Sequence, residues 1–250
     1  MKKIYFATLA LAMTACVSNE DLNPVDNYGY IDVNVSNDPV MVTRGEQSVN
    51  DLTGWTIKTQ LGESAAEDWT STKPYKAGTY KVIAQSHENE TAWQSANSSW
   101  GAAYYEGTDN EVIVSAGQTG AVEISCGNAQ NARLKVEFSL VSNFTEYSLK
   151  AERDLVFNAS NSETALAYYA ATEEVDYTFS YKYNGTPKAK AGKITMKGAA
   201  TENIISISSN DNGKISITIS YNDTFGKGNS ETLTFDAATG TIEETPNAQQ

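Results

Sequence analysis

Few residues in this chain have side chains suited to chemistry, and their surroundings argue against catalysis. The chain contains one histidine, His87, and two cysteines, Cys16 and Cys126. His87 lies among carboxylates in the polar run Ser86-His87-Glu88-Asn89-Glu90, which is typical of a solvated loop. Cys126 ends an alternating apolar run, and no histidine stands in a recognisable nucleophile–base arrangement with it. We therefore interpret Cys126 as a small buried hydrophobic residue.

One acidic turn has residue types that could bind a metal ion. The segment Ser209-Asn210-Asp211-Asn212-Gly213 resembles a calcium-binding loop. Placing Gly213 at the sixth loop position puts Ile219 where a bidentate acidic ligand is required, so a turn between two strands is the better interpretation. The chain also lacks a Gly-x-Ser-x-Gly elbow, a His-Glu-x-x-His helix and a phosphate-binding glycine loop. These observations predict a protein that is not an enzyme and uses no metal or cofactor.

One polar segment, residues 88 to 110, is rich in aromatic residues. Rings among Ser, Asn and Gln can bind sugars, because their faces stack on the sugar ring while amides pair with its hydroxyls. The alternative is that these rings cover an end of the fold, since tryptophan is usually largely buried. The candidate contacts to a glycan or a receptor are Trp93, Trp100, Tyr104 and Tyr105.

The remaining cysteine, Cys16, indicates lipidation. Lys2 and Lys3 precede an apolar run, residues 4 to 12, that is too short to span a bilayer. The tetrapeptide Met13-Thr14-Ala15-Cys16 resembles the lipobox of bacterial lipoproteins, with Met13 where leucine is usual. We predict a signal peptide over residues 1–15 and acylation of Cys16, with chains such as palmitate. An ordinary secretory signal with an incidental cysteine is the alternative.

Composition limits the remaining classes of function. The chain has 31 acidic and 18 basic residues and a net charge of -13, which disfavours nucleic acid as a partner. Removal of the signal peptide leaves one cysteine besides the acylated Cys16, so no intrachain disulfide is expected. The abundance of Tyr, Thr, Ser, Asn, Val and Ile favours strands and tight turns over helices.

Alternating apolar and polar residues indicate an all-β fold of antiparallel sandwiches. After a flexible lipidated tether at residues 16–27, we predict an N-terminal sandwich at 28–130 and a C-terminal one at 131–245, divided near residues 127 to 131. Residues 37 to 50 are expected to form an exposed loop, and residues 160 to 172 fit a helix or a strand equally well. The predicted strands cover residues 31–36, 52–59, 80–84, 111–115, 121–126, 134–140, 147–151, 154–157, 177–183, 192–197, 203–208, 214–221 and 231–235.

Several segments together resemble a known family. They are the lipobox followed by Glu20-Asp21, the opening run 28–35, the stretch Tyr75-Lys76-Ala77-Gly78-Thr79-Tyr80, and Tyr104-Tyr105-Glu106-Gly107 before residues 112 to 117. In these features the chain is similar to the fimbrillin-like surface lipoproteins of Bacteroidales, related to type V pili, and to their cell-adhesion group. The resemblance implies two tandem transthyretin-like β-sandwiches, anchored to the outer membrane by the lipid on Cys16 and exposed at the cell surface.

The resemblance also implies a maturation step. In fimbrillins an arginine-specific protease removes the first strand, and a strand of the next subunit fills the groove. Here Arg44-Gly45 follows the first predicted strand, so cleavage after Arg44 is expected; an uncut loop is the alternative. Residues 243 to 250 lack the apolar alternation of a donor strand, which favours a tip, an anchor or a stand-alone adhesin over a shaft subunit.

Two hypotheses of function follow. The first is a surface adhesin or accessory pilus subunit, with other pilus subunits or a surface glycan or protein as partners. The second is an outer-membrane glycan-binding lipoprotein of a polysaccharide-uptake system that uses the four aromatic residues named above. A surface lipoprotein without a ligand of its own is a third interpretation.

Overall fold

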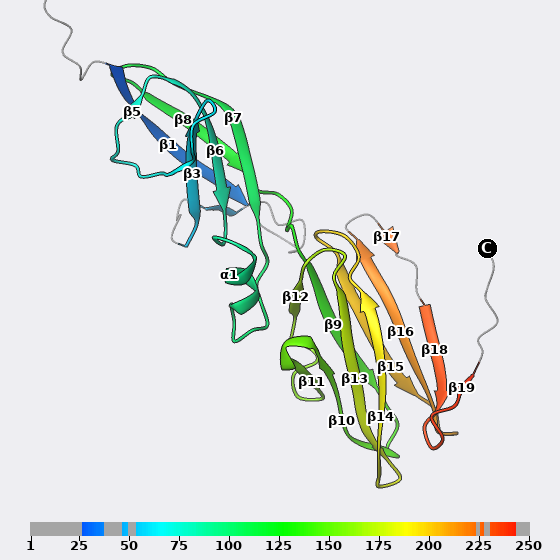
Figure 1. The fold of residues 1–250 in the computed structure, drawn as a ribbon. Helices are drawn as coiled ribbons and strands as arrows, with labels where there is room; N and C mark the ends of the chain where they lie inside the picture. Colours follow the sequence, from blue (N-terminus) through cyan, green and yellow to red (C-terminus); the bar gives the residue numbers. More distant parts are fainter. Residues whose placement is uncertain (1–26, 38–46, 50–53, 224–225, 228–230, 244–250) are drawn as a thin grey trace, which may run out of the picture.

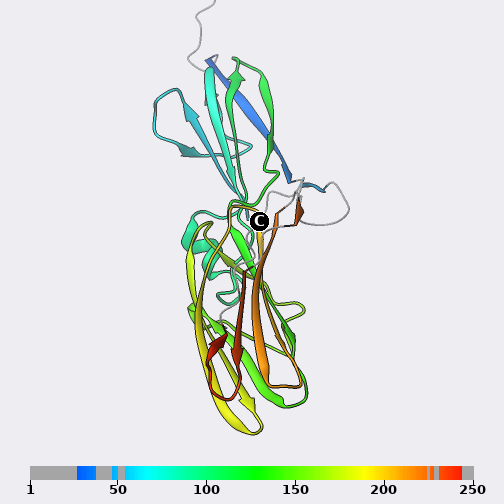
Figure 2. The same ribbon diagram turned by 90° about the vertical axis from the view of Figure 1, so that its right-hand side faces the viewer.

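The computed structural model describes residues 27–37, 47–49, 54–223, 226–227 and 231–243, and these form almost entirely β-strands (Figure 1). Two β-sandwiches follow each other along the chain, and Figures 1 and 2 show them end to end. Each has a hydrophobic core of its own, one built from residues between 31 and 126 and the other from residues between 132 and 237. The predicted all-β sandwich fold is confirmed. The domain limits themselves stay a prediction.

The first sandwich consists of two sheets. In one sheet β1 (Tyr28–Asn37) pairs with β8 (Thr119–Ser125), β2 (Gln47–Val49) and β5 (Tyr75–Lys76). The other sheet has the order β4-β3-β6-β7, formed by Glu67–Asp68, Thr56–Leu61, Gly78–Gln85 and Glu106–Val114. The inward faces supply alternate residues to the core, among them Ile31, Val33, Val35, Tyr80, Val82, Ala84, Val122 and Ile124.

A helix, α1 (Glu90–Ser95), lies between β6 and β7. It begins at Asn89, whose side-chain oxygen accepts a hydrogen bond from the Ala92 N–H at 3.0 Å, as an N-cap residue does. The sequence analysis placed only a polar connection here, because a six-residue helix is too short to show apolar periodicity. A membrane-spanning helix is absent from the described part of the chain.

The second sandwich also consists of two sheets. One has the order β11-β10-β13-β14, formed by Val156–Asn158, Phe144–Ala151, Glu174–Tyr183 and Thr186–Thr195, with a 3-10 turn at Glu152–Asp154 between β10 and β11. The other has the order β12-β9-β15-β16-β18-β19, formed by Ala167–Tyr169, Ala132–Ser139, Glu202–Ser209, Lys214–Asp223, Glu231–Asp236 and Ile242–Glu243. A short strand, β17 (Gly226–Lys227), pairs with β16.

The hairpin from β13 to β14 shows how local sequence builds this sandwich. Along β13 every second side chain is buried, so the strand covers the core with one face. The hairpin closes at Asn184-Gly185, where both residues have positive φ and Tyr183 pairs with Thr186. Asn-Gly is the preferred pair for such a two-residue turn, and the prediction of a turn at this position is correct.

Strand pairing departs from a purely antiparallel scheme at one place in each sandwich. β1 runs parallel to β8 over residues 30–36, and β9 runs parallel to β15 over residues 133–139. Alternation identifies which face of a strand is buried but does not identify its neighbour, so the sequence analysis did not predict these pairs.

The structure revises the limits of several predicted segments and decides one that the sequence left open. Residues 37 to 50 are not wholly loop, because β2 pairs with the end of β1. The strand predicted from residue 52 begins at Thr56, and the one predicted from residue 111 begins at Glu106. Residues 167–169, where helix and strand fitted equally well, form β12 because Ala167 and Tyr169 both enter the second core.

Candidate functional site

The first question about the site is whether the described residues could hold a metal ion. None of them form a group of three or more His, Cys, Asp and Glu that could hold a metal ion. The predicted turn at residues 210 to 213 joins β15 to β16, and the Asn210 side-chain oxygen accepts hydrogen bonds from the backbone N–H groups of Asn212 and Lys214. The Asn210 oxygen is thus engaged within the turn.

Burial shifts the pKa values of both Cys126 and His87 toward their neutral forms. Cys126 is 1% exposed, and burial together with the Glu106 carboxylate raises the pKa of its thiol to about 11. The thiol therefore stays protonated at neutral pH, and its interpretation as a small core residue is confirmed. Partial burial lowers the pKa of His87, so its imidazole is neutral at pH 7 and lies 3.1 Å from the Ser86 hydroxyl.

Three predicted site residues lie outside the described residues. These are the lipidation site Cys16 and the two sides of the expected cleavage, Arg44 and Gly45. The signal peptide and nearly all of the tether lie there too. These assignments stay predictions.

The structure divides the four aromatic residues that were grouped in the sequence. Trp93 is the buried residue of α1 and is 3% exposed, so its ring is not available to a sugar. Trp100 packs against the second core, with its ring centroid 4.9 Å from that of Phe157. Tyr105 packs against the first core. The four rings therefore do not form one surface.

Tyr104 has a structural role of its own. Its hydroxyl donates a hydrogen bond to Glu106 at 2.5 Å and accepts one from the Gln85 side chain at 2.9 Å. Burial and the nearby Glu106 carboxylate raise the pKa of Tyr104 to about 12, so the phenol remains neutral. This ring supports the start of β7 rather than standing free.

The segment from α1 to residue 105 joins the two sandwiches. The Tyr168 N–H donates to the Trp100 carbonyl at 2.8 Å, and the Arg153 guanidinium donates to the Gln94 carbonyl at 3.1 Å. The same guanidinium stacks over the Tyr169 ring, 4.4 Å from its centroid. We call this set of contacts the junction.

A pocket of about 430 Å³ opens at the junction. The rings of Trp100 and Tyr168 line it together with two asparagine side chains. Aromatic rings beside amides are the combination that suits sugar binding. Most of the lining comes from residues 161 to 168, whose conformation the sequence left open. The lining residues are Asn97, Trp100, Gly101, Asn161, Thr164, Ala165, Leu166 and Tyr168.

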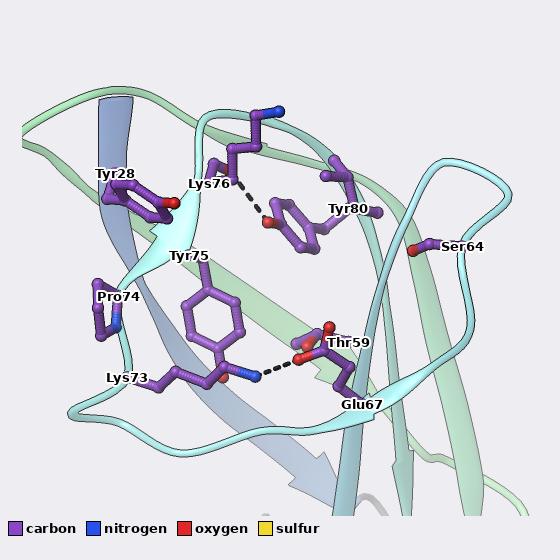
Figure 3. Close-up of a pocket in the computed structure, with 10 residues that line it drawn as sticks. Tyr28, Thr59, Ser64, Glu67, Lys73, Pro74, Tyr75, Lys76 and Tyr80 are labelled. Atoms are coloured by element: carbon purple, nitrogen blue, oxygen red, sulfur yellow. Dashed lines mark hydrogen bonds and ion pairs between the residues drawn. The ribbon is translucent and has the colours of Figure 1, made fainter. Parts of the chain in front are cut away.

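A second pocket, of about 320 Å³, lies at the end of the first sandwich where β1 begins (Figure 3). We call it the tyrosine pocket. Tyr75 and Tyr80 meet edge to face with ring centroids 5.7 Å apart, and the Tyr80 hydroxyl donates to the Lys76 carbonyl at 2.9 Å. The lining residues are Tyr28, Thr59, Leu61, Ser64, Glu67, Lys73, Pro74, Tyr75, Lys76 and Tyr80.

The tyrosine pocket arises from the stretch 73–80, which the sequence analysis singled out without assigning it a site. Pro74 precedes the two residues of β5, and Gly78 has a φ of +158°, with the Leu61 side chain 2.6 Å from where a β-carbon would stand. The chain passes from one sheet to the other between β5 and β6, and both tyrosines line the same pocket. Tyr28 and Thr59 line the same pocket as Tyr75 and Tyr80. The sequence pattern could not predict this, because tertiary packing decides where their strands lie.

β1 contributes to the first core and is held by different partners along its two edges. Its three inward side chains, Ile31, Val33 and Val35, are all at least 94% buried. Parallel pairing to β8 covers one edge along seven residues, whereas β5 and β2 cover only the two ends of the other edge. Between these ends the Ile31 carbonyl accepts a hydrogen bond from the Trp69 indole at 2.9 Å.

A family model described as "Domain of unknown function (DUF4493)" matches residues 29–239, which run from β1 to the last turn before β19. The chain belongs to this family. The match spans nearly all of both sandwiches of the DUF4493 chain and leaves out Tyr28 and β19. No curated protein matches the chain.

Solved structures with similar folds come from three bacteria. A "putative cell adhesion protein" from Bacteroides fragilis is 12% identical, with a TM-score of 0.36 over 78% of this chain and 98% of that chain. One of the same description from Bacteroides ovatus is 10% identical, with a TM-score of 0.38 over 82% and 96%. A fimbrial assembly protein from Parabacteroides distasonis is 8% identical, with a TM-score of 0.43 over 86% and 98%.

These names agree with the resemblance found in the sequence.

Proposed function

We propose that this protein is a surface-exposed lipoprotein that acts in cell adhesion or as an accessory or tip subunit of a pilus. Its lipid on Cys16 holds it in the outer membrane. Cleavage after Arg44 would release β1 together with the anchor, and a strand from a partner subunit would take the place of β1.

The position of β1 is the observation that carries this proposal. β1 fills the core of the first sandwich with three alternate side chains, and its removal would leave an apolar groove beside the free edge of β8. An incoming strand with the same alternation would restore both the buried side chains and the backbone hydrogen bonds. The segment after Asn37 carries the expected cleavage site, so a single cut there separates β1 from the rest of the chain.

Substitution of Arg44 tests the maturation step. In cells of a host that assembles such lipoproteins, we expect the wild-type protein to begin at Gly45 in its surface form. The Arg44→Lys variant keeps the positive charge but is not a substrate for an arginine-specific protease, so it should begin at Cys16. Mass spectrometry of the N-terminal peptide distinguishes the two forms. Finding Cys16 still joined to Gly45 in every wild-type molecule would contradict cleavage.

The junction pocket favours the second hypothesis, a glycan-binding lipoprotein. Trp100 is the one residue of the predicted aromatic set that lines this pocket, and Tyr168 provides a second ring. Affinity electrophoresis against a polysaccharide panel should show retardation that is lost in Trp100→Ala and weakened in Thr164→Ala. Trp55→Ala removes a partly buried tryptophan that does not line the junction pocket, so it serves as the control and should migrate like the wild type. Equal migration of all variants in every polysaccharide would exclude this function for the pocket.

A further inference from the structure

The floor of the tyrosine pocket holds a buried hydroxyl. Thr59 follows Ile57 on the inward face of β3 and is 2% exposed, and it lines the pocket. A ligand hydroxyl in the tyrosine pocket can reach the Thr59 side chain, whose hydroxyl can both donate and accept a hydrogen bond.

The walls of the tyrosine pocket are apolar and aromatic. Tyr75 is almost fully buried, and Tyr28 stands at the edge with 43% of its surface exposed. Leu61 and Pro74 complete the apolar lining. The exposed ring of Tyr28 can pack against the C–H groups of a sugar ring, with Tyr75 behind it as an apolar wall.

The rim of the tyrosine pocket is polar. Glu67 and Lys73 form an ion pair there, and Figure 3 shows this pair facing the space that Tyr75 and Tyr80 enclose. Both side chains keep exposed surface, so the carboxylate can accept hydrogen bonds and the ammonium can donate them to a ligand. A volume of about 320 Å³ admits a single six-membered sugar ring.

We propose that the tyrosine pocket binds one pyranose residue of a neutral glycan, and that it does so only while β1 is in place. The second part rests on the proposed release of β1. Tyr28 belongs to β1 and pairs with Lys76, while Gly29 pairs with Tyr75. Loss of β1 therefore removes one wall of the pocket and the strand partner of two other lining residues. By linkage, a bound glycan stabilises the form that retains β1.

Two tyrosines on the same strand provide a matched test. Tyr28 and Tyr30 are 43% and 45% exposed, but only Tyr28 lines the pocket. Saturation-transfer NMR with the full-length protein should detect binding of at least one of five sugars. These are the methyl pyranosides of glucose, galactose, mannose, fucose and N-acetylglucosamine. Binding should weaken about tenfold in Tyr28→Ala and about three- to tenfold in Thr59→Val, and it should be unchanged in Tyr30→Ala.

Different results would contradict the sugar site and its dependence on β1. No binding by any of the five glycosides at millimolar concentration, or equal weakening by Tyr28→Ala and Tyr30→Ala, overturns the sugar site. For the link to β1, protein cut after Arg44 is followed by size-exclusion chromatography. With the glycoside present at about nine times its Kd, the equilibrium constant for release of the β1 segment should fall about tenfold. Binding without any change in release keeps the sugar site and overturns the link, and a chain that is never cut overturns only the proposed maturation.

Discussion

Replacing Ile31 by alanine is expected to lower the free energy of unfolding of the first sandwich by about 2–5 kcal/mol. Ile31 is 1% exposed and lies among the core residues that β1 shares with β8. Its truncation removes buried methyl groups and leaves a cavity that surrounding strands can fill only in part. Urea unfolding of the full-length protein, followed by the fluorescence of Trp55 and Trp69 near this core, measures the change.

The neighbouring residue provides the control for this experiment. Asp32 lies on the same strand with its side chain exposed, so Asp32→Ala should change the stability by no more than about 0.5 kcal/mol. Similar losses in Ile31→Ala and Asp32→Ala would show that β1 does not insert into the core. In that case the groove on which the proposed strand exchange depends would not exist.

Replacing Phe157 by alanine is expected to cost about 3–5 kcal/mol in the second sandwich. Phe157 has no exposed surface and supports the Trp100 ring edge to face at the junction. The substitution therefore opens a cavity in the second core and also removes the contact that holds Trp100. The unfolding transition of the second sandwich should shift to lower urea, and the signal of Trp100 should change before global unfolding.

Val156 is the matched control for Phe157. It precedes Phe157 on β11 but faces solvent with 38% of its surface exposed. Val156→Ala should therefore leave both the transition and the Trp100 signal close to those of the wild type. An unchanged Trp100 signal in Phe157→Ala would mean that the backbone contacts of the junction, rather than the ring contact, position this tryptophan.

These two variants probe the features on which the proposals depend. β1 must be a true core strand if its release is to create a groove, and the junction must be rigid if its pocket is to keep its shape. Gly29 adds a constraint at the start of β1, because a β-carbon there would stand 2.3 Å from the Ser115 carbonyl oxygen. The close approach of β1 to the turn after β7 thus requires glycine.

The sequence by itself determined the buried face of the strands in which apolar and polar residues alternate clearly. Ile31, Val33 and Val35 alternate with polar residues, and the structure buries all three. The same reasoning placed Cys126 in the core and the hairpin turn at Asn184-Gly185. These features depend on neighbours within a few residues, through the period of two in a strand and the positive φ that a tight turn needs.

Only the tertiary structure decided which segments meet. It paired β1 with β8, separated Trp93 and Trp100 into different environments, and brought Tyr28 and Thr59 to the stretch 73–80. Strand order and the lining of pockets depend on contacts between residues far apart in the chain. Alternation is the same whichever strand lies alongside, so local pattern carries no information about the partner.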